Sequence, residues 1–151
     1  MYQVPPRRVY FVSIQISEKQ KSQIDFGKEV YFRYPEIPNT DSFEYDNIDS
    51  VKQKINEHRN ESGQSNVYAL IIEPFSGGNL LQCSTEFLQK LQKICNDNNV
   101  ILIFDEIYVG WYKTGNRFNF MGHDVIPDIL TMSKSLGGGK SSISAYVSRE
   151  S

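Results

Sequence analysis

The 151-residue sequence is poor in cysteine: it has only Cys83 and Cys95, and these two are not in the spacing of a metal site. This argues against a disulfide-stapled secreted domain and makes a reduced, cytoplasmic setting the default expectation. No apolar run approaches the roughly 20 residues of a membrane-spanning helix, and the N-terminus lacks the apolar core of a signal peptide. We therefore expect neither a bound metal ion nor a membrane partner.

The sequence also lacks an excess of charge of either sign. Sixteen Lys and Arg residues stand against 18 Asp and Glu residues, which gives a formal net charge of −2 at pH 7. This balance provides no electrostatic case for binding nucleic acid or an anionic membrane. What the sequence does contain is apolar residues, 39% of the total with nine Phe and nine Tyr, enough to bury the core of one domain.

Hydrophobic patterning predicts an α/β fold with a mostly parallel sheet and flanking helices. The order strand, helix, strand, helix, strand is typical of βαβ units. Each helix shows an apolar stripe at helical spacing, and Ser84 is a candidate N-cap for the second. Four apolar residues before Asp105, bounded by charge, predict a strand buried on both faces. We expect strands at residues 9–16, 29–34, 67–72, 101–104, 127–133 and 144–148, and helices at residues 47–60 and 85–97.

Two of the expected strands end in residues with useful chemistry. Asp105 follows one strand, and Lys134 follows the next, just before the glycines at residues 137–139. In open α/β sheets, ligands bind outside the carboxyl ends of the strands. A primary amine there can form a Schiff base with an aldehyde cofactor, and an acid can hold a pyridinium proton. Taken alone, however, Asp105 could simply cap a turn, and Lys134 could be a solvated side chain.

Three ordered motifs carry a family resemblance. Residues 67–74 (VYALIIEP), 105–115 (DEIYVGWYKTG) and 127–139 (PDILTMSKSLGGG) resemble the class III aminotransferases, which are pyridoxal-phosphate (PLP) enzymes of fold type I. The spacing from Asp105 to Lys134 matches the family spacing without an insertion. The resemblance implies that residues 29–151 are a central, incomplete part of the PLP-binding large domain, with residues 1–28 as an unmatched N-terminal segment.

The resemblance also implies a role for individual residues. Lys134 corresponds to the lysine that forms the Schiff base and carries the proton between carbons, and Asp105 to the acid that pairs with the pyridine nitrogen. Ile107 stands where the family has a valine that packs on the cofactor ring. Tyr108 replaces a glutamine that hydrogen-bonds the cofactor's phenolic oxygen, a bond that the tyrosine hydroxyl could make. Glu73 corresponds to the glutamate of a Glu-Pro motif behind the cofactor.

Several positions depart from the family pattern. Lys140 competes with Lys134 as the reactive amine, but the family usually has an apolar residue or proline after the triple glycine, which favours Lys134. Gly78 occupies a position where many members have a second acid. Lys113 replaces an arginine, and Tyr112 replaces a glycine. For Cys83, Cys95, His58 and His123, structural or surface roles are favoured over catalytic ones.

The function implied by the resemblance is PLP-dependent transfer of an amino group from a small amine or amino acid to an oxo acid. Full-length members are considerably longer, carry a phosphate-binding loop and a small domain, and are expected to be homodimers. We find neither of these two elements in the sequence and expect it to be a middle slice of the large domain. The alternative function is therefore a truncated, non-catalytic remnant or a partner subunit, inactive alone. The substrate pair cannot be deduced from these residues.

Overall fold

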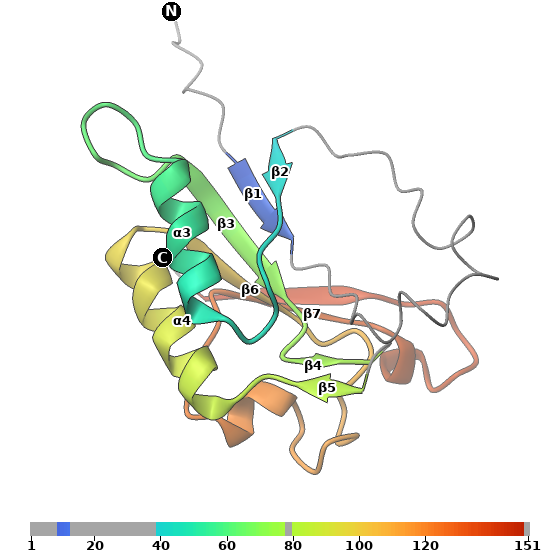
Figure 1. The fold of residues 1–151 in the computed structure, drawn as a ribbon. Helices are drawn as coiled ribbons and strands as arrows, with labels where there is room; N and C mark the ends of the chain where they lie inside the picture. The colour runs from blue at the N-terminus through green and yellow to red at the C-terminus, as the bar shows by residue number, and fades with distance from the viewer. Residues whose placement is uncertain (1–8, 13–38, 78–79, 150–151) are drawn as a thin grey trace, which may run out of the picture.

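The computed structural model describes residues 9–12, 39–77 and 80–149. They form a six-stranded sheet in the order β2-β1-β3-β6-β7-β8, with α3 (Ile48–Glu57) and α4 (Thr85–Asp97) packed together against it (Figure 1). The strands are β1 (Val9–Val12), β2 (Thr40–Asp41), β3 (Val67–Ile72), β6 (Ile101–Asp105), β7 (Ile129–Met132) and β8 (Ala145–Ser148). A small antiparallel pair, β4 (Phe75–Ser76) and β5 (Leu81–Gln82), follows β3.

The sheet is parallel except at one edge. The pairs β1–β2, β1–β3, β3–β6 and β6–β7 are parallel, and β8 runs antiparallel to β7. This confirms the predicted α/β fold with a mostly parallel sheet. The central strands β3, β6 and β7 are neighbours, so their carboxyl ends meet at the same edge of the sheet.

Both predicted helices form, because each has a local start signal and an apolar stripe. The side chain of Asn47 accepts hydrogen bonds from the backbone N–H groups of Asp49 and Ser50 at the start of α3. The Ser84 hydroxyl accepts one from Phe87 N at the start of α4, as predicted. Such caps satisfy donors that would otherwise have no partner in the first helical turn.

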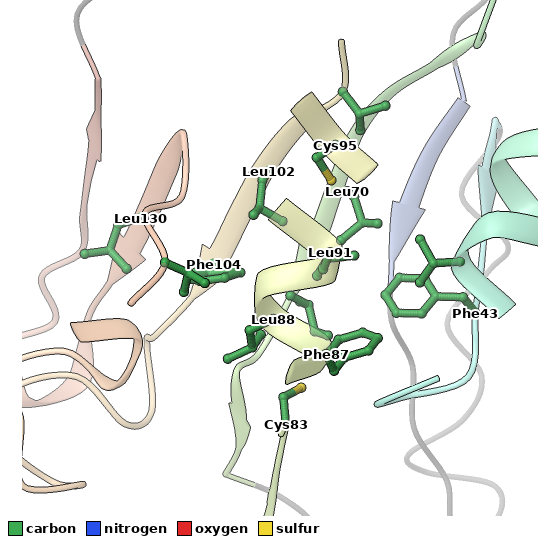
Figure 2. Packing of buried hydrophobic residues seen from close by; sticks show 14 of the residues in the cluster. Phe43, Leu70, Cys83, Phe87, Leu88, Leu91, Cys95, Leu102, Phe104 and Leu130 are labelled. Carbon is green, nitrogen blue, oxygen red and sulfur yellow. The ribbon is translucent and has the colours of Figure 1, made fainter. Parts of the chain in front are cut away.

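The core lies between the helices and the sheet. Side chains of α4 pack over buried strand residues that include Leu70, Leu102 and Phe104 (Figure 2). In the sheet, Leu70 is in register with Leu102, and Ile72 with Phe104. From α4 the buried residues are Phe87, Leu88, Leu91 and Cys95, and from α3 they are Val51 and Ile55. The expected apolar stripes therefore face the core, although Ile48 and Ile94 are only partly buried.

The prediction that the strand before Asp105 is buried on both faces is wrong for the described residues. Along β6, Leu102 and Phe104 are buried, whereas Ile101, Ile103 and Asp105 are half-buried. The register partners of Ile103 on the two neighbouring strands, Ile71 and Ile129, are also half-buried. The described helices cover one face of the sheet, so an unbroken apolar run here belongs to a strand with one fully buried face.

Two of the expected strands lie wholly or partly outside the described residues. The strand expected at residues 29–34 lies outside the described residues, as do residues 13–16 of the strand that begins at Val9. Within the described ranges, no helix is both long and apolar enough to cross a membrane. In the same ranges, no group of three or more His, Cys, Asp or Glu side chains is arranged to hold a metal ion.

Candidate active site

The carboxyl edge of the central strands brings three predicted site residues together. Glu73 directly follows β3, Asp105 ends β6, and Lys134 comes two residues after the end of β7. The register pairs Ile72 with Phe104, so Glu73 and Asp105 follow at the same level on adjacent strands. For Asp105 and Lys134 this meeting is the expected one, because parallel neighbouring strands end on the same side.

Asp105 is held by its neighbours with one oxygen left over. Its Oδ1 accepts hydrogen bonds from the Thr131 hydroxyl, 3.1 Å away on β7, and from the backbone N–H of Ile107 at 3.0 Å. Its Oδ2 accepts no hydrogen bond from any other described residue. A carboxylate fixed through one oxygen and open at the other is suited to accept a hydrogen bond from a protonated ring nitrogen.

Lys134 occupies an unusual backbone position. It begins the short 3-10 turn Lys134–Gly137 with φ +41°, a value that non-glycine residues rarely adopt. Such conformations cost roughly 1–3 kcal/mol and tend to occur at functional sites. The preceding Ser133 hydroxyl donates a hydrogen bond to the carbonyl of Ile143 at 2.8 Å, which ties the turn to the segment leading into β8.

An open cavity of about 450 Å³ lies beside this turn. Both Lys134 and Lys140 line it, so the cavity alone does not separate the two candidate amines. The difference lies in their surroundings, because the ammonium nitrogen of Lys134 lies 4.8 Å from the ring centroid of Tyr108. The remaining lining residues are Ser133, Gly139, Ser141, Ser142, Ile143 and Ser144.

The other predicted site residues each make a different contact; they are Glu73, Ile107 and Tyr108. Glu73 Oε2 accepts a hydrogen bond from the backbone N–H of Gly77 at 3.0 Å, so the carboxylate shapes its own loop. Ile107 is half-buried, and its backbone N–H orients Asp105. Tyr108 is 41% exposed and offers its ring to Lys134. The departure expected at Gly78 lies outside the described residues.

Glu106 is a residue that the sequence analysis did not single out. Its side chain is fully buried and accepts hydrogen bonds from the backbone N–H groups of Asn119 at 2.6 Å and Phe120 at 2.9 Å. Burial raises the pKa of the Glu106 carboxyl above its usual value. The carboxylate thus fastens the far end of the loop at residues 107–118, which carries Ile107 and Tyr108.

Tyr45 is a second such residue. Its hydroxyl lies 3.0 Å from the carbonyl oxygens of both Glu73 and Leu81, so it joins the end of β3 to β5. Burial raises the pKa of this hydroxyl well above its ordinary value, which keeps it a hydrogen-bond donor. No local sequence signal could have found this contact, because α3 and β3 lie between Tyr45 and its partners.

The two histidines and the two cysteines have surroundings that fit structural roles. His123 is buried, with Nδ1 2.8 Å from the Thr85 hydroxyl and Nε2 3.1 Å from the side-chain nitrogen of Gln82. His58 lies 3.1 Å from Asp41. Cys83 and Cys95 are free and buried, and burial raises the pKa of each thiol to about 12. A thiol with so high a pKa is a poor nucleophile at neutral pH.

The described residues fit the aldehyde and nitrogen sides of PLP. Lys134 offers a primary amine just after β7, and Asp105 on the adjacent strand offers Oδ2, which accepts no hydrogen bond from the described residues. These are the two groups that an aldehyde-bearing, protonated pyridine requires. The fit rests on this donor set, which comes from two different strands and is therefore a property of the fold.

The family model and the similar curated proteins indicate the same family. The model of the family "Aminotransferase class-III" matches residues 9–151. The acetylornithine aminotransferase of Clostridium acetobutylicum is 36% identical over 118 residues, which cover 78% of this chain and 28% of that protein. The acetylornithine aminotransferase of Nostoc sp. is 36% identical over 116 residues, covering 75% and 27%. The chain thus spans little more than a quarter of the curated relatives it matches.

Solved structures show the same fold. An ornithine aminotransferase from Toxoplasma gondii superposes with a TM-score of 0.75 at 24% identity, over 98% of this chain and 35% of that one. A transaminase from the marine bacterium Virgibacillus gives a TM-score of 0.76 at 20% identity, over 95% and 34%. Another structure of the Toxoplasma gondii enzyme reports partial occupancy of PLP at its active site.

Proposed function

The chain belongs to the class III aminotransferases, and on that premise we propose that it provides the acid and amine of a PLP-dependent aminotransferase site. The reaction is transfer of an amino group from an amine or amino acid to an oxo acid. The observation that carries the proposal is the placement of Asp105 and Lys134 at the carboxyl ends of the adjacent parallel strands β6 and β7.

Each residue has a defined task in this proposal. PLP supplies an aldehyde and an electron-accepting ring when it is bound. Lys134 Nζ would bind the aldehyde and, once the substrate's amine has displaced it, would be a free neutral amine able to accept a proton from the substrate carbon. Asp105 Oδ2 accepts the hydrogen bond of the protonated ring nitrogen, while its Oδ1 stays bound to Thr131 and Ile107 N. Ile107 packs on the ring.

Tyr108 and Glu73 act at the edge of the same site. In the proposal carried over from the family, the Tyr108 hydroxyl donates a hydrogen bond to the phenolic oxygen of the cofactor. Glu73 shapes the loop after β3 through its bond to Gly77 N. Both assignments rest on register with the family motifs and on the closeness of these residues to Lys134 and Asp105.

The names of the relatives suggest a substrate class. The curated relatives are named acetylornithine aminotransferases, and several similar solved structures are ornithine aminotransferases. We therefore propose an amino donor of the ornithine or acetylornithine type and a small oxo acid acceptor. A homodimeric assembly and a cytoplasmic location are proposed with it, the first from the family and the second from the two free, buried cysteines.

Release of an oxo product from an amino donor tests the proposal. The chain is incubated with PLP, each donor of a panel (ornithine, acetylornithine, 4-aminobutyrate) is added, and the carbonyl product is quantified. We expect product with the wild-type chain and with Lys140→Ala, and none with Lys134→Ala. Absence of product with the wild type would favour the non-catalytic alternative, and product with Lys134→Ala would contradict the role given to Lys134.

A further inference from the structure

The ring of Tyr108 has two ammonium groups over it. The Nζ atoms of Lys113 and Lys134 each lie 4.8 Å from the ring centroid, although the two lysines come from different elements. A cation within about 6 Å of an aromatic centroid is attracted by the negative face of the ring. Lys113 is also hydrogen-bonded to the backbone carbonyl of Tyr108, which fixes its own position.

The side chain of Tyr108 packs directly against the backbone of Gly77. A Cβ atom at Gly77 would lie only 2.1 Å from Cγ and Cδ1 of Tyr108 and 2.8 Å from its Cβ. These atoms are close to the Tyr108 backbone and cannot swing away without moving the whole side chain. The glycine is itself held, because its N–H donates to Glu73 Oε2. The ring therefore packs on the Glu73 loop on one side and meets Lys134 on another.

The position of Tyr108 is also fixed from its own chain. Asp105 accepts a hydrogen bond from Ile107 N, one residue before the tyrosine. Glu106 fastens the returning end of the same loop at Asn119 and Phe120. The ring is thus placed by buried or half-buried contacts, even though it is 41% exposed itself.

We propose that the ring of Tyr108, which packs against Gly77, is a positioning surface that holds the ammonium group of Lys134. This inference rests on the proposed function in assigning Lys134 as the reactive amine. It differs from the carried-over role of Tyr108, which uses the hydroxyl and not the ring. Because the ring attracts the ammonium form, Nζ must lose its proton to solvent and leave the ring before it can add to an aldehyde carbon and release water.

The two roles of Tyr108 predict opposite responses to substitution. If the ring holds Lys134, Nζ of Lys134 stays over the ring in Tyr108→Phe, whereas Tyr108→Leu frees the amine. The strength of an exposed cation–π contact corresponds to roughly a two- to fivefold change in an equilibrium. If the hydroxyl alone holds Lys134, Tyr108→Phe and Tyr108→Leu release the Lys134 amine to the same extent.

The experiment uses a readout that needs no PLP. All lysines are reductively ¹³C-methylated, which keeps their charge, and the dimethyl resonance of Lys134 is assigned by its absence in Lys134→Arg. We expect an upfield ring-current shift of this resonance in the wild type, in Tyr108→Phe and in Lys113→Ala. The shift should disappear in Tyr108→Leu and in Gly77→Ala, while the resonance of Lys54, which is paired with Asp41 on β2, stays constant as a folding control.

Limited chemical labelling then measures how readily the Lys134 amine reacts. At low formaldehyde, with cyanoborohydride as the hydride donor, mass mapping should show two- to fivefold more methyl label at Lys134 in Tyr108→Leu than in the wild type, and no change in Tyr108→Phe. An unshifted Lys134 resonance in the wild type, or a shift that survives Tyr108→Leu, would overturn the proposal. Equal labelling in all variants would overturn it as well. Neither readout depends on PLP, so failure of the proposed function would leave these results unchanged.

Discussion

Among single residues, the buried carboxylate of Glu106 makes contacts that no motif indicates. It accepts from two backbone N–H groups and has no exposed surface. In Glu106→Gln the new amide nitrogen would face one of these donors and leave it unpaired. We expect a loss of about 1–3 kcal/mol in the free energy of unfolding, measured by urea denaturation.

The matched control for this prediction is Glu86→Gln. Glu86 lies on the surface of α4, where its carboxylate pairs with Lys90. Exposed pairs of this kind contribute little, so the control should change the free energy of unfolding by less than about 0.5 kcal/mol. Equal losses in the two variants would show that the Glu106 carboxylate does not fasten its loop.

His123 should make stability depend on pH. Its Nε2 faces the amide nitrogen of Gln82, so this atom accepts, and Nδ1–H donates to the Thr85 hydroxyl. Protonation would turn Nε2 into a donor facing a donor. Burial lowers the pKa of His123 in the folded chain, so the unfolded chain binds more protons just below pH ~6.5. Stability is thus retained above that pH and falls as pH drops below it.

The measurement is the free energy of unfolding of the wild type and of His123→Gln at several pH values between neutral and mildly acidic. The wild type should lose stability over this window more steeply than the variant does. His58→Gln serves as the control, because it removes the other histidine of the sequence and leaves His123 in place. A wild-type slope that is unchanged in His123→Gln and lost in His58→Gln would contradict the prediction.

Some residue contacts could be predicted from the sequence, and others could not. Asp105 and Lys134 could be paired in advance because each ends a strand and parallel neighbours end at one edge. The roles of Glu106 and Tyr45 could not be predicted, because their partners are backbone groups 13 and 28 or more residues away. The contact of Tyr108 with Gly77 depends on loop geometry, which residue types alone do not specify.

At the scale of elements, α3 and α4 were predictable because their signals are local. A cap and an apolar stripe lie within the helix itself. In Asn47→Ala two N–H groups of the first turn of α3 lose their acceptor. We expect a loss of about 1 kcal/mol in the free energy of unfolding by urea denaturation. Asn96→Ala, on the exposed side of α4, should change stability by only a few tenths of a kcal/mol; a similar loss there would refute the cap assignment.

Strand burial was less predictable than strand position. Strands β3, β6 and β7 lie where the apolar runs predicted them. Whether a strand is buried on one face or two depends on which elements cover the sheet, and that is not encoded within the strand. The half-buried row formed by Ile71, Ile103 and Ile129 records this difference between local pattern and tertiary environment.

At the scale of the whole molecule, strand order places the chemistry. The arrangement β3-β6-β7 puts Glu73, Asp105 and Lys134 on one edge, whereas the apolar clusters of α3 and α4 occupy one face. A hydrophobic core on one side thus supports a polar edge at the strand ends. Family membership explains the order of the motifs, and the register of the sheet explains why motifs far apart in sequence lie at the same edge.

Trapping of PLP on the chain tests the central claim most directly. The chain is incubated with PLP, reduced with borohydride and digested, and the pyridoxyl group is located by peptide mass mapping. The proposed site predicts label on the peptide that contains Lys134, loss of that label in Lys134→Ala, and its retention in Lys140→Ala. Label found mainly on Lys140, or spread evenly over surface lysines, would contradict the assignment of Lys134 and Asp105 as the cofactor site.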